Sequence, residues 1–181
     1  MALRATIYKC ELAVSDMDRG HYATHSLTLA RHPSETEERL MVRLLAFALF
    51  ADDALEFGRG LSTEGDADLE RRDATGAIEL WLDVGLPDER DVRKACGRAR
   101  QVVVLAYGGR KADQWWAQNA AALGRQSNLR VLALSAEATA QLQSLAARSM
   151  QLTCTIHDGH VWLGSDTAAV EVVPQQWLRQ P

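Results

Sequence analysis

The sequence predicts an α/β fold, in which a mixed β-sheet carries helices on both faces and β-hairpins are added at both ends of the chain. Three observations favour this class. The central segments are expected in the order helix, strand, strand, strand, helix, strand, which is typical of a mixed sheet covered by helices. QVVVLAYG (101–108) is a continuous apolar run, as in a strand buried on both faces. The segments near both termini have the alternating pattern and turn residues of hairpins.

Length, composition and charge narrow the class further. The chain has 181 residues, of which 47% are hydrophobic, and this is enough for one core, so we expect a single domain over residues 1–181. The formal net charge of −4 argues against a dedicated DNA-binding module, which needs a broad basic surface. It leaves room for an enzyme with a local basic groove.

The cysteines and the N-terminal segment bear on the compartment. Cys10, Cys96 and Cys154 are odd in number, far apart and without CxxC spacing, so we expect free thiols in a reducing compartment. The start, MALRATIYKC, has no apolar signal core, and the longest apolar run (40–50) contains Arg43 and is too short to span a bilayer. These features predict a soluble cytoplasmic protein without a membrane partner, and we favour a monomer.

A hairpin and a long helix are expected first. Residues 3–14 alternate like a strand, 15–20 (SDMDRG) form a turn, and 21–30 are the returning strand. Ser34 and Glu37 then have the spacing of a capping box at the start of a helix. The apolar stripe of this helix consists of Leu40, Met41, Leu44, Leu45, Ala48 and Leu49.

Strands and helices alternate over the rest of the chain. A short strand (55–61) and a polar loop (62–76) precede the strand 77–85, and Pro87 with the acidic residues after it favours a helix that ends near Arg98. The later elements are expected to be a strand at 101–108, a helix at 110–123, a strand at 129–134, a helix at 136–148, a hairpin at 151–164 around Asp158-Gly159 and a last strand at 169–173.

One face of the strand 78–84 combines carboxylates with a tryptophan. Alternation points the aliphatic residues to one side and Glu79, Trp81 and Asp83 to the other. Glu79 and Asp83 are separated by roughly 13 Å at the rise of a strand, so they cannot share one metal ion. A metal site at Asp83 therefore needs a second carboxylate from another segment.

The preceding hairpin arm offers such a carboxylate. Asp66 and Asp68 have the parity to oppose Asp83, and directly opposed carboxylates are close enough to hold one hard cation. The alternative is a solvated acidic arm without a ligand. Glu38 stands at the top of the apolar stripe of the first helix, where a carboxylate usually has a partner, although it could also serve the helix dipole. Glu35, one turn earlier, is expected to do only the latter.

Four stretches of the chain resemble the YaeQ family. They are SLTLARHPSETEERLMVRLLA (26–46), FGRGL (57–61), IELWLDVGLPDERDVRKA (78–95) and DGHVWL (158–163). The resemblance extends over essentially the whole chain. It implies the three-layer PD-(D/E)XK nuclease-like fold, the αβββαβ core of magnesium-dependent endonucleases.

The resemblance also implies site residues. The "PD" of the motif corresponds to Asp68, where Ala67 replaces the proline, and the (D/E)-x-K part falls on Asp83-Val84-Gly85, where glycine replaces the lysine. A cation from the next helix would have to replace that lysine. Lys94 is favoured by analogy with nuclease-like folds in which the lysine has moved to a helix. Arg93 is better placed on the helical wheel, because Lys94 lies nearly opposite the expected buried face.

Two function hypotheses follow. The first is a phosphodiesterase that acts on DNA or RNA and depends on Mg²⁺ (or Mn²⁺), with the metal held by Asp68 and Asp83 and with Glu38 as a further ligand or as a partner of metal-bound water. The second is a non-catalytic module that binds nucleic acid or a protein of the transcription or repair machinery. Arg59 and Trp81 are candidates for substrate contacts; an ordinary loop arginine and a tryptophan that covers the sheet are the alternatives.

Overall fold

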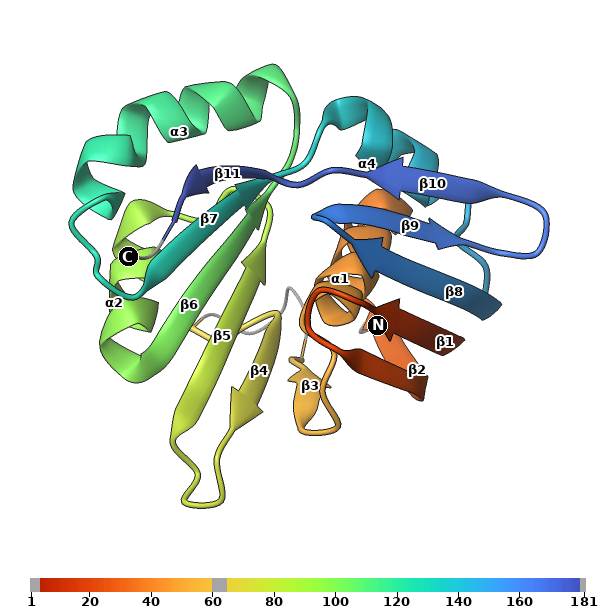
Figure 1. The fold of residues 1–181 in the computed structure, drawn as a ribbon. Coiled ribbons are helices and arrows are strands. Elements are labelled where there is room, and N and C mark those ends of the chain that lie inside the picture. The colour runs from red at the N-terminus through yellow and green to blue at the C-terminus, as the bar shows by residue number, and fades with distance from the viewer. Residues whose placement is uncertain (1–3, 60–64, 180–181) are drawn as a thin grey trace.

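The structure is a computed structural model that describes residues 4–59 and 65–179. Within these ranges the chain is a mixed α/β protein with two mixed β-sheets and four helices, so the predicted α/β class is confirmed (Figure 1). The helices are α1 (Glu37–Leu49), α2 (Glu89–Arg98), α3 (Arg110–Leu123) and α4 (Ala136–Gln143). The last of these ends five residues earlier than its apolar pattern predicted.

The centre of the chain forms a six-stranded sheet, which we call sheet B. Its strands lie in the order β11 (Gln175–Leu178), β7 (Leu129–Ala133), β6 (Ala99–Ala106), β5 (Ile78–Val84), β4 (Leu69–Arg72) and β3 (Leu55–Phe57). β5, β6 and β7 run parallel, whereas β3, β4 and β11 pair antiparallel with their neighbours. The element order from α1 to β6 agrees with the expectation, but the edge strand β11 was not predicted.

The two terminal hairpins meet in a separate five-stranded sheet, which we call sheet A. Its order is β10 (Ala169–Val172), β9 (His160–Gly164), β8 (Ser149–His157), β1 (Thr6–Asp16) and β2 (His21–Arg31). β1 and β8 come from opposite ends of the chain and pair in parallel. The predicted turn between β8 and β9 is confirmed, since Asp158 and Gly159 both have positive φ, as a two-residue hairpin turn requires. The hairpins thus form an accessory layer and do not extend sheet B.

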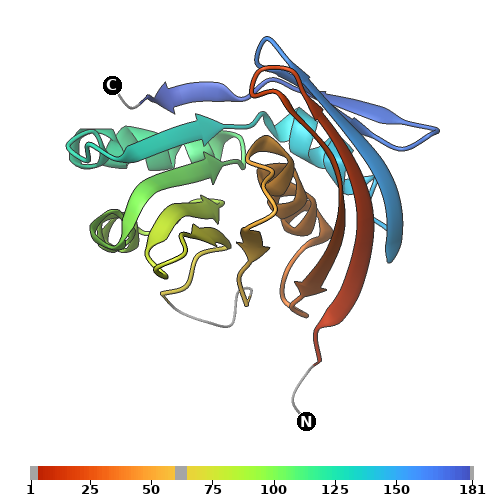
Figure 2. The ribbon, with the colours of Figure 1, turned by 60° about the horizontal axis from the view of Figure 1, so that its bottom comes forward.

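Helix α1 lies between the two sheets and joins their cores. Leu40, Leu44 and Phe47 are at most 2% exposed, and they belong to one cluster with Leu12 of β1 and Leu80 of β5. The curved sheet A covers the side of α1 that faces away from sheet B (Figure 2). The helix therefore buries nearly its whole circumference, which explains why its apolar stripe is so wide.

The other face of sheet B is covered by α2 and α3 (Figure 1). Val92 of α2 and Leu123 of α3 pack with Trp81 and Val104 in a second cluster. Along β5 the alternation is as expected from Leu80 to Val84, with Trp81 on the side of α2. Ile78 is the exception, because it joins the second cluster beside the shift in register between β4 and β5.

The start of α1 differs from the predicted capping box. Thr36, not Ser34, is the N-cap, and its side chain accepts a hydrogen bond from the backbone N–H of Arg39. Ser34 instead lies against the imidazole of His32, with 2.6 Å between Ser34 Oγ and His32 Nδ1. The helix begins two residues later than the box implied, and Glu35 is left in the segment that precedes it.

The thiols and the helices bear on two simpler expectations. Cys10, Cys96 and Cys154 are all free, and Cys10 and Cys154 are buried in the core beneath sheet A. Burial raises the pKa of both of these thiols to about 12, which makes them poor nucleophiles. Among the described residues, no helix combines the length and the hydropathy needed to cross a membrane.

Candidate functional site

A cleft opens where β5 and β6 end and α2 passes beside them. Its volume is about 1110 Å³. The carboxyl ends of parallel strands are the usual place for ligand sites in open α/β sheets. The charged and phenolic side chains that line the cleft are Arg39, Asp66, Asp68, Asp83, Asp91, Lys94, Arg98 and Tyr107. This mixture of acids and bases makes the cleft the candidate site.

Asp68 and Asp83 oppose each other at the wall of this cleft. The last paired residues of β4 and β5 are Leu69 and Leu82, so Asp68 stands at the next position, opposite Asp83. The backbone N–H of Asp68 donates to Asp83 Oδ1 (3.3 Å), and the N–H of Val84 donates to Asp68 Oδ2 (2.8 Å). Each carboxylate is therefore fixed by the backbone beside its partner. Asp66 is exposed and also lines the cleft.

The two carboxylates influence each other electrostatically. Burial and, after it, the negative charge of Asp68 raise the pKa of Asp83 to about 6. Hydrogen bonds from Trp81 Nε1 (2.9 Å) and from the Asp68 N–H lower this pKa, as does Arg39, but they do not cancel the rise. A half-buried pair of like charges is a place where a cation is favoured.

A series of ion pairs leads from the core into the cleft. Arg43 is 1% exposed and donates to Glu35 Oε1 (2.6 Å) and to the carbonyl oxygen of Ala30 (3.0 Å). The other oxygen of Glu35 accepts from Arg39 (2.8 Å), and Arg39 in turn donates to Asp68 Oδ1 (2.8 Å). Arg39 thus brings a fixed positive charge to the carboxylate pair.

The roles expected for the two glutamates at the start of α1 need correction. Glu35 was expected to serve only the helix dipole, yet it is 1% exposed and ion-paired through both oxygens. Glu38 is half-buried, and its charge contributes to the raised pKa of Tyr107, which places it near the rim of the cleft. Its role as a metal ligand stays a prediction. The spacing of Glu35, Arg39 and Arg43, four residues apart, is a visible signal that favours successive ion pairs.

The structure separates the two cations that were expected to replace the motif lysine. Lys94 is exposed and lines the cleft with Asp83, whereas Arg93 pairs with Glu89 of its own helix at 2.6 Å. Gly85, which the resemblance aligned with that lysine, has a φ of +100°. Residues with a side chain rarely adopt this conformation, so the backbone itself disfavours a lysine there.

Trp81 and Arg59, the two candidates for substrate contacts, lie in different surroundings. Trp81 is 4% exposed, donates its indole N–H to Asp83, and is covered by the guanidinium of Arg98 at 4.9 Å from its ring. This geometry suits the positioning of Asp83 better than the stacking of a base. Arg59 is exposed in an adjoining cavity of about 510 Å³, which shares Asp66 and Arg98 with the cleft. Both substrate roles stay predictions.

Tyr107 lines the cleft, although no sequence motif pointed to it. It follows the last residue of β6, Ala106, and faces the same cleft as the carboxylate pair. Burial and the charges of Glu38, Glu35 and Asp68 raise its pKa to about 12, against the influence of Arg39. The phenol is therefore neutral at ordinary pH and is suited to give or accept a hydrogen bond rather than to act as a base.

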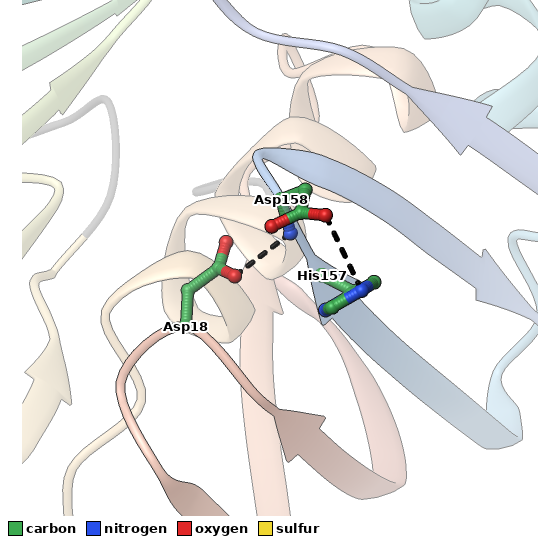
Figure 3. Close-up of side chains that lie close together, drawn as sticks. All are labelled: Asp18, His157 and Asp158. Atoms are coloured by element: carbon green, nitrogen blue, oxygen red, sulfur yellow. Dashed lines mark hydrogen bonds and ion pairs between the residues drawn. The ribbon is translucent and has the colours of Figure 1, made fainter.

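Another acidic group lies well away from the cleft, at the turns of sheet A. Asp18, His157 and Asp158 form the one compact three-ligand group among the described residues (Figure 3). All three are exposed, and the carboxylate of Asp18 accepts the backbone N–H groups of Asp158 (2.8 Å) and Gly159 (2.9 Å). These bonds lower the pKa of Asp18 and tie the β1–β2 turn to the β8–β9 turn. The group has a structural explanation and needs no metal.

The fold and the cleft define a class: an α/β protein with a carboxylate pair at the carboxyl end of parallel strands. The chain belongs to the YaeQ family, because the family model described as YaeQ protein matches residues 1–174. The YaeQ protein of Escherichia coli (strain K12) is 45% identical over 181 residues, which cover 100% of this chain and 99% of that protein. The YaeQ protein of Salmonella typhi matches with the same identity and coverage.

Solved structures of YaeQ proteins have the same fold. The crystal structure of the YaeQ protein from Xanthomonas axonopodis pv. citri has a TM-score of 0.94 at 55% identity, over 98% of this chain and 99% of that one. The crystal structure of YaeQ protein from Pseudomonas syringae has a TM-score of 0.92 at 33% identity, over 97% of each chain. The two-sheet architecture is therefore shared with these relatives.

Proposed function

We propose that the protein is a Mg²⁺-dependent, nuclease-like phosphodiesterase that acts on nucleic acid and is built on a three-layer PD-(D/E)XK-like core. One observation carries this proposal: Asp68 and Asp83 oppose each other across two strands, at the wall of a cleft that also contains Lys94. The family resemblance supports the same residues, since it aligns Asp68 and Asp83 with the two motif acids.

The donor set suits Mg²⁺ or Mn²⁺. Both ions prefer carboxylate oxygens, and Asp68 and Asp83 offer these from two fixed backbones. Among the described residues that line the cleft, the carboxylates number four and the cationic side chains three. A divalent cation would therefore turn the local charge from negative to positive, which a phosphodiester requires.

Each side chain then has a defined task. A bound Mg²⁺ supplies charge that polarises the phosphate and lowers the pKa of an attacking water. Asp68 and Asp83 hold the ion, and Glu38 is a further ligand or a partner of metal-bound water. Lys94 offsets negative charge on the phosphate in the transition state. Arg39 is held by its hydrogen bond to Glu35 and orients Asp68 through a second hydrogen bond.

Cleavage of labelled DNA and RNA, single-stranded and double-stranded, tests the proposal. The wild type is expected to cleave at least one form with Mg²⁺ and none with EDTA. Lys94→Ala should reduce cleavage by about 100-fold or more, the scale of losing one preorganised contact to the transition state. Arg93→Ala is the matched control on the same helix and should cleave normally. Equal loss in both variants, or none in either, would contradict the role of Lys94.

Tryptophan fluorescence tests the metal separately from the chemistry. The indole N–H of Trp81 donates to Asp83 Oδ2, so a cation bound at Asp83 should change the environment of that indole. We expect Mn²⁺ to change the emission of the wild type, and Asp83→Asn to abolish this response because a formal charge and a metal–oxygen contact are lost. A titration unchanged in the variant would remove Asp83 from the site.

A second candidate function is a non-catalytic module that binds nucleic acid or a protein of the transcription or repair machinery. Two observations favour it. Asp68 already forms an ion pair with Arg39, and glycine stands at position 85 in place of the motif lysine. Retarded migration of DNA or RNA without turnover, lost in Lys94→Ala, would support this function over the first.

The cellular setting belongs to the proposal as well. Free thiols that are buried or half-buried suit the reducing cytoplasm, where nucleic acid and Mg²⁺ are both present. The monomeric state that we favour is part of the same proposal. Sedimentation analysis at micromolar concentration measures the oligomeric state directly.

A further inference from the structure

Two histidines of β2 meet on the less exposed side of that strand, and neither belongs to the cleft lining. Nε2 of His21 lies 3.0 Å from Nε2 of His25, with ring centroids 5.2 Å apart and ring planes 13° from parallel. The two nitrogens share one hydrogen bond, and Ala23, on the same side of the strand, has only a methyl group beneath them. The two rings thus point their Nε2 atoms at each other.

The surroundings fix one of these imidazoles in place. His25 is 8% exposed and packs edge-on against Phe47, with 5.0 Å between the ring centroids. Its other nitrogen, Nδ1, faces Asp53 Oδ1 at 3.9 Å. This distance is too long for a hydrogen bond, so Asp53 orients His25 only if its exposed side chain moves closer when a metal binds at the opposite nitrogen.

We propose that Nε2 of His21 and Nε2 of His25 bind one Zn²⁺ ion, with water completing the coordination and Asp53 orienting His25. Tetrahedral Zn–N bonds of about 2.0–2.1 Å keep two ligand nitrogens about 3.3 Å apart. The observed 3.0 Å is close to this separation, and the ion would replace the hydrogen bond between the two nitrogens once each ring turns its Nε2 lone pair toward it. Access is open, because His21 is half-buried and the Asp53 side chain is 98% exposed.

The surroundings of His25 affect its charge. Burial, and then the neighbouring charge of His21, lower the pKa of His25, against the influence of Asp53 and Asp52. A lowered pKa favours the neutral imidazole, which is the form that binds a metal. Imidazole nitrogens favour zinc, copper and nickel over Mg²⁺, so this site and the carboxylate pair of the cleft select different ions.

Isothermal titration of the full chain, free of any affinity tag, with Zn²⁺ at pH 7.5 tests the proposal. We expect one equivalent to bind the wild type. His21→Gln and His25→Gln should each weaken this binding at least 10-fold. Asp53→Asn should weaken it about 10-fold, which is the lower end of the usual loss of metal affinity when a residue that orients a ligand is replaced. His157→Gln is the matched control, since His157 belongs to the other group of candidate ligands.

Absorption of bound Co²⁺ gives a second reading, because intense visible bands mark a tetrahedral site. These bands should be present in the wild type and in His157→Gln, and absent from His21→Gln. If His25→Gln fails to fold, the half-buried His21→Gln decides. Loss of binding in His157→Gln alone would place the ion at the turns of sheet A and overturn the proposal. The proposal also fails if wild-type protein binds no Zn²⁺ or if both β2 variants bind as the wild type does.

Discussion

Gly85 stands at the position that the proposed nuclease motif assigns to a lysine, and its backbone has a φ of +100°. The strand ends here, and the chain turns toward Pro87 and α2. A Cβ at this position would meet no atom within 4 Å, so space is not the obstacle; the backbone conformation is. A positive charge therefore has to reach the carboxylates from elsewhere, and Arg39 and Lys94 are the cations placed to supply it.

Alanine substitution tests this explanation at the level of the backbone. Gly85→Ala should lower the free energy of unfolding by about 1–2 kcal/mol, because a Cβ is strained at positive φ. Gly97→Ala is the control within α2, where a Cβ also meets open space; it should raise the free energy of unfolding by about 0.5–1 kcal/mol, since alanine favours a helix. Urea denaturation measures both. Opposite signs are expected, and equal signs would refute the explanation.

Asp83 makes stability depend on pH. Its pKa rises from 3.8 to about 6 on folding, so the native state holds this proton more tightly than the unfolded state does. With EDTA present to remove metal ions, the free energy of unfolding should therefore fall as the pH rises from about 4 to about 6. It should level off above that pH. At about 1.4 kcal/mol per pH unit, Asp83 accounts for roughly 2–3 kcal/mol of this fall.

Urea denaturation at a series of pH values measures this dependence. In Asp83→Asn the fall between pH 4 and pH 6 should largely disappear, since the side chain no longer titrates. Asp66→Asn changes an exposed carboxylate of the same cleft and should keep the wild-type profile. A wild-type profile that rises through this window would contradict the raised pKa of Asp83.

At the scale of elements, α1 does two things at once. Its apolar side chains join the cores of both sheets, while Arg39 and Arg43 carry charge along its length to Glu35 and Asp68. Breaking a buried ion pair by removing one partner costs more than the pair contributes, because the remaining charge stays buried. The position of the cleft carboxylates therefore depends on a residue in the core.

Neutralising Glu35 tests this dependence. Glu35→Gln leaves Arg43 buried without its carboxylate and should lower the free energy of unfolding by about 3–5 kcal/mol. Glu38→Gln, three residues later and half-buried, should change it by less than about 0.5 kcal/mol. Thermal and urea denaturation measure both variants. A small effect in Glu35→Gln would show that water solvates Arg43 when its carboxylate partner is removed.

Much of this element structure was predictable because it follows from local pattern. The period-two strands, the stripe of α1 and the Asp158-Gly159 turn all appear in the sequence, as does the parity that opposes Asp68 to Asp83. Other features depend on tertiary contacts. Arg39 pairs with Asp68 across 29 residues of chain. β11 has little apolar pattern of its own but pairs with β7 and stacks Trp177 on Trp116. Such features become visible only when distant segments are brought together.

At the scale of the whole molecule, the two ends of the chain complete each other. β1 lies between β2 and β8 in sheet A, and Leu12 and Leu152 at one level of that pairing are both buried. Without β8 the N-terminal hairpin would keep one long unpaired edge and would leave α1 partly uncovered. The accessory sheet is thus required for the core, although it contributes no residue to the cleft lining.

Truncation tests this requirement. A chain that ends at residue 148 lacks β8 to β11 and should be insoluble or bind hydrophobic dyes, because the apolar side of α1 is exposed. A chain that ends at residue 174 loses only the edge strand β11 and should remain folded with reduced stability. Circular dichroism and dye fluorescence distinguish the two. A compact, soluble chain of residues 1–148 would refute the requirement.

The pairing of β1 with β8 also has a consequence for how the protein is made. Arg148 beside β8 binds the carbonyl oxygen of Ile7 in β1 across 141 residues of chain. At about 5–20 residues per second, a ribosome needs roughly 7–28 seconds to add that length. During this time one edge of the nascent hairpin has no partner strand. Sheet A can close only after nearly all of the protein has been translated, so its assembly is a late event in the cell.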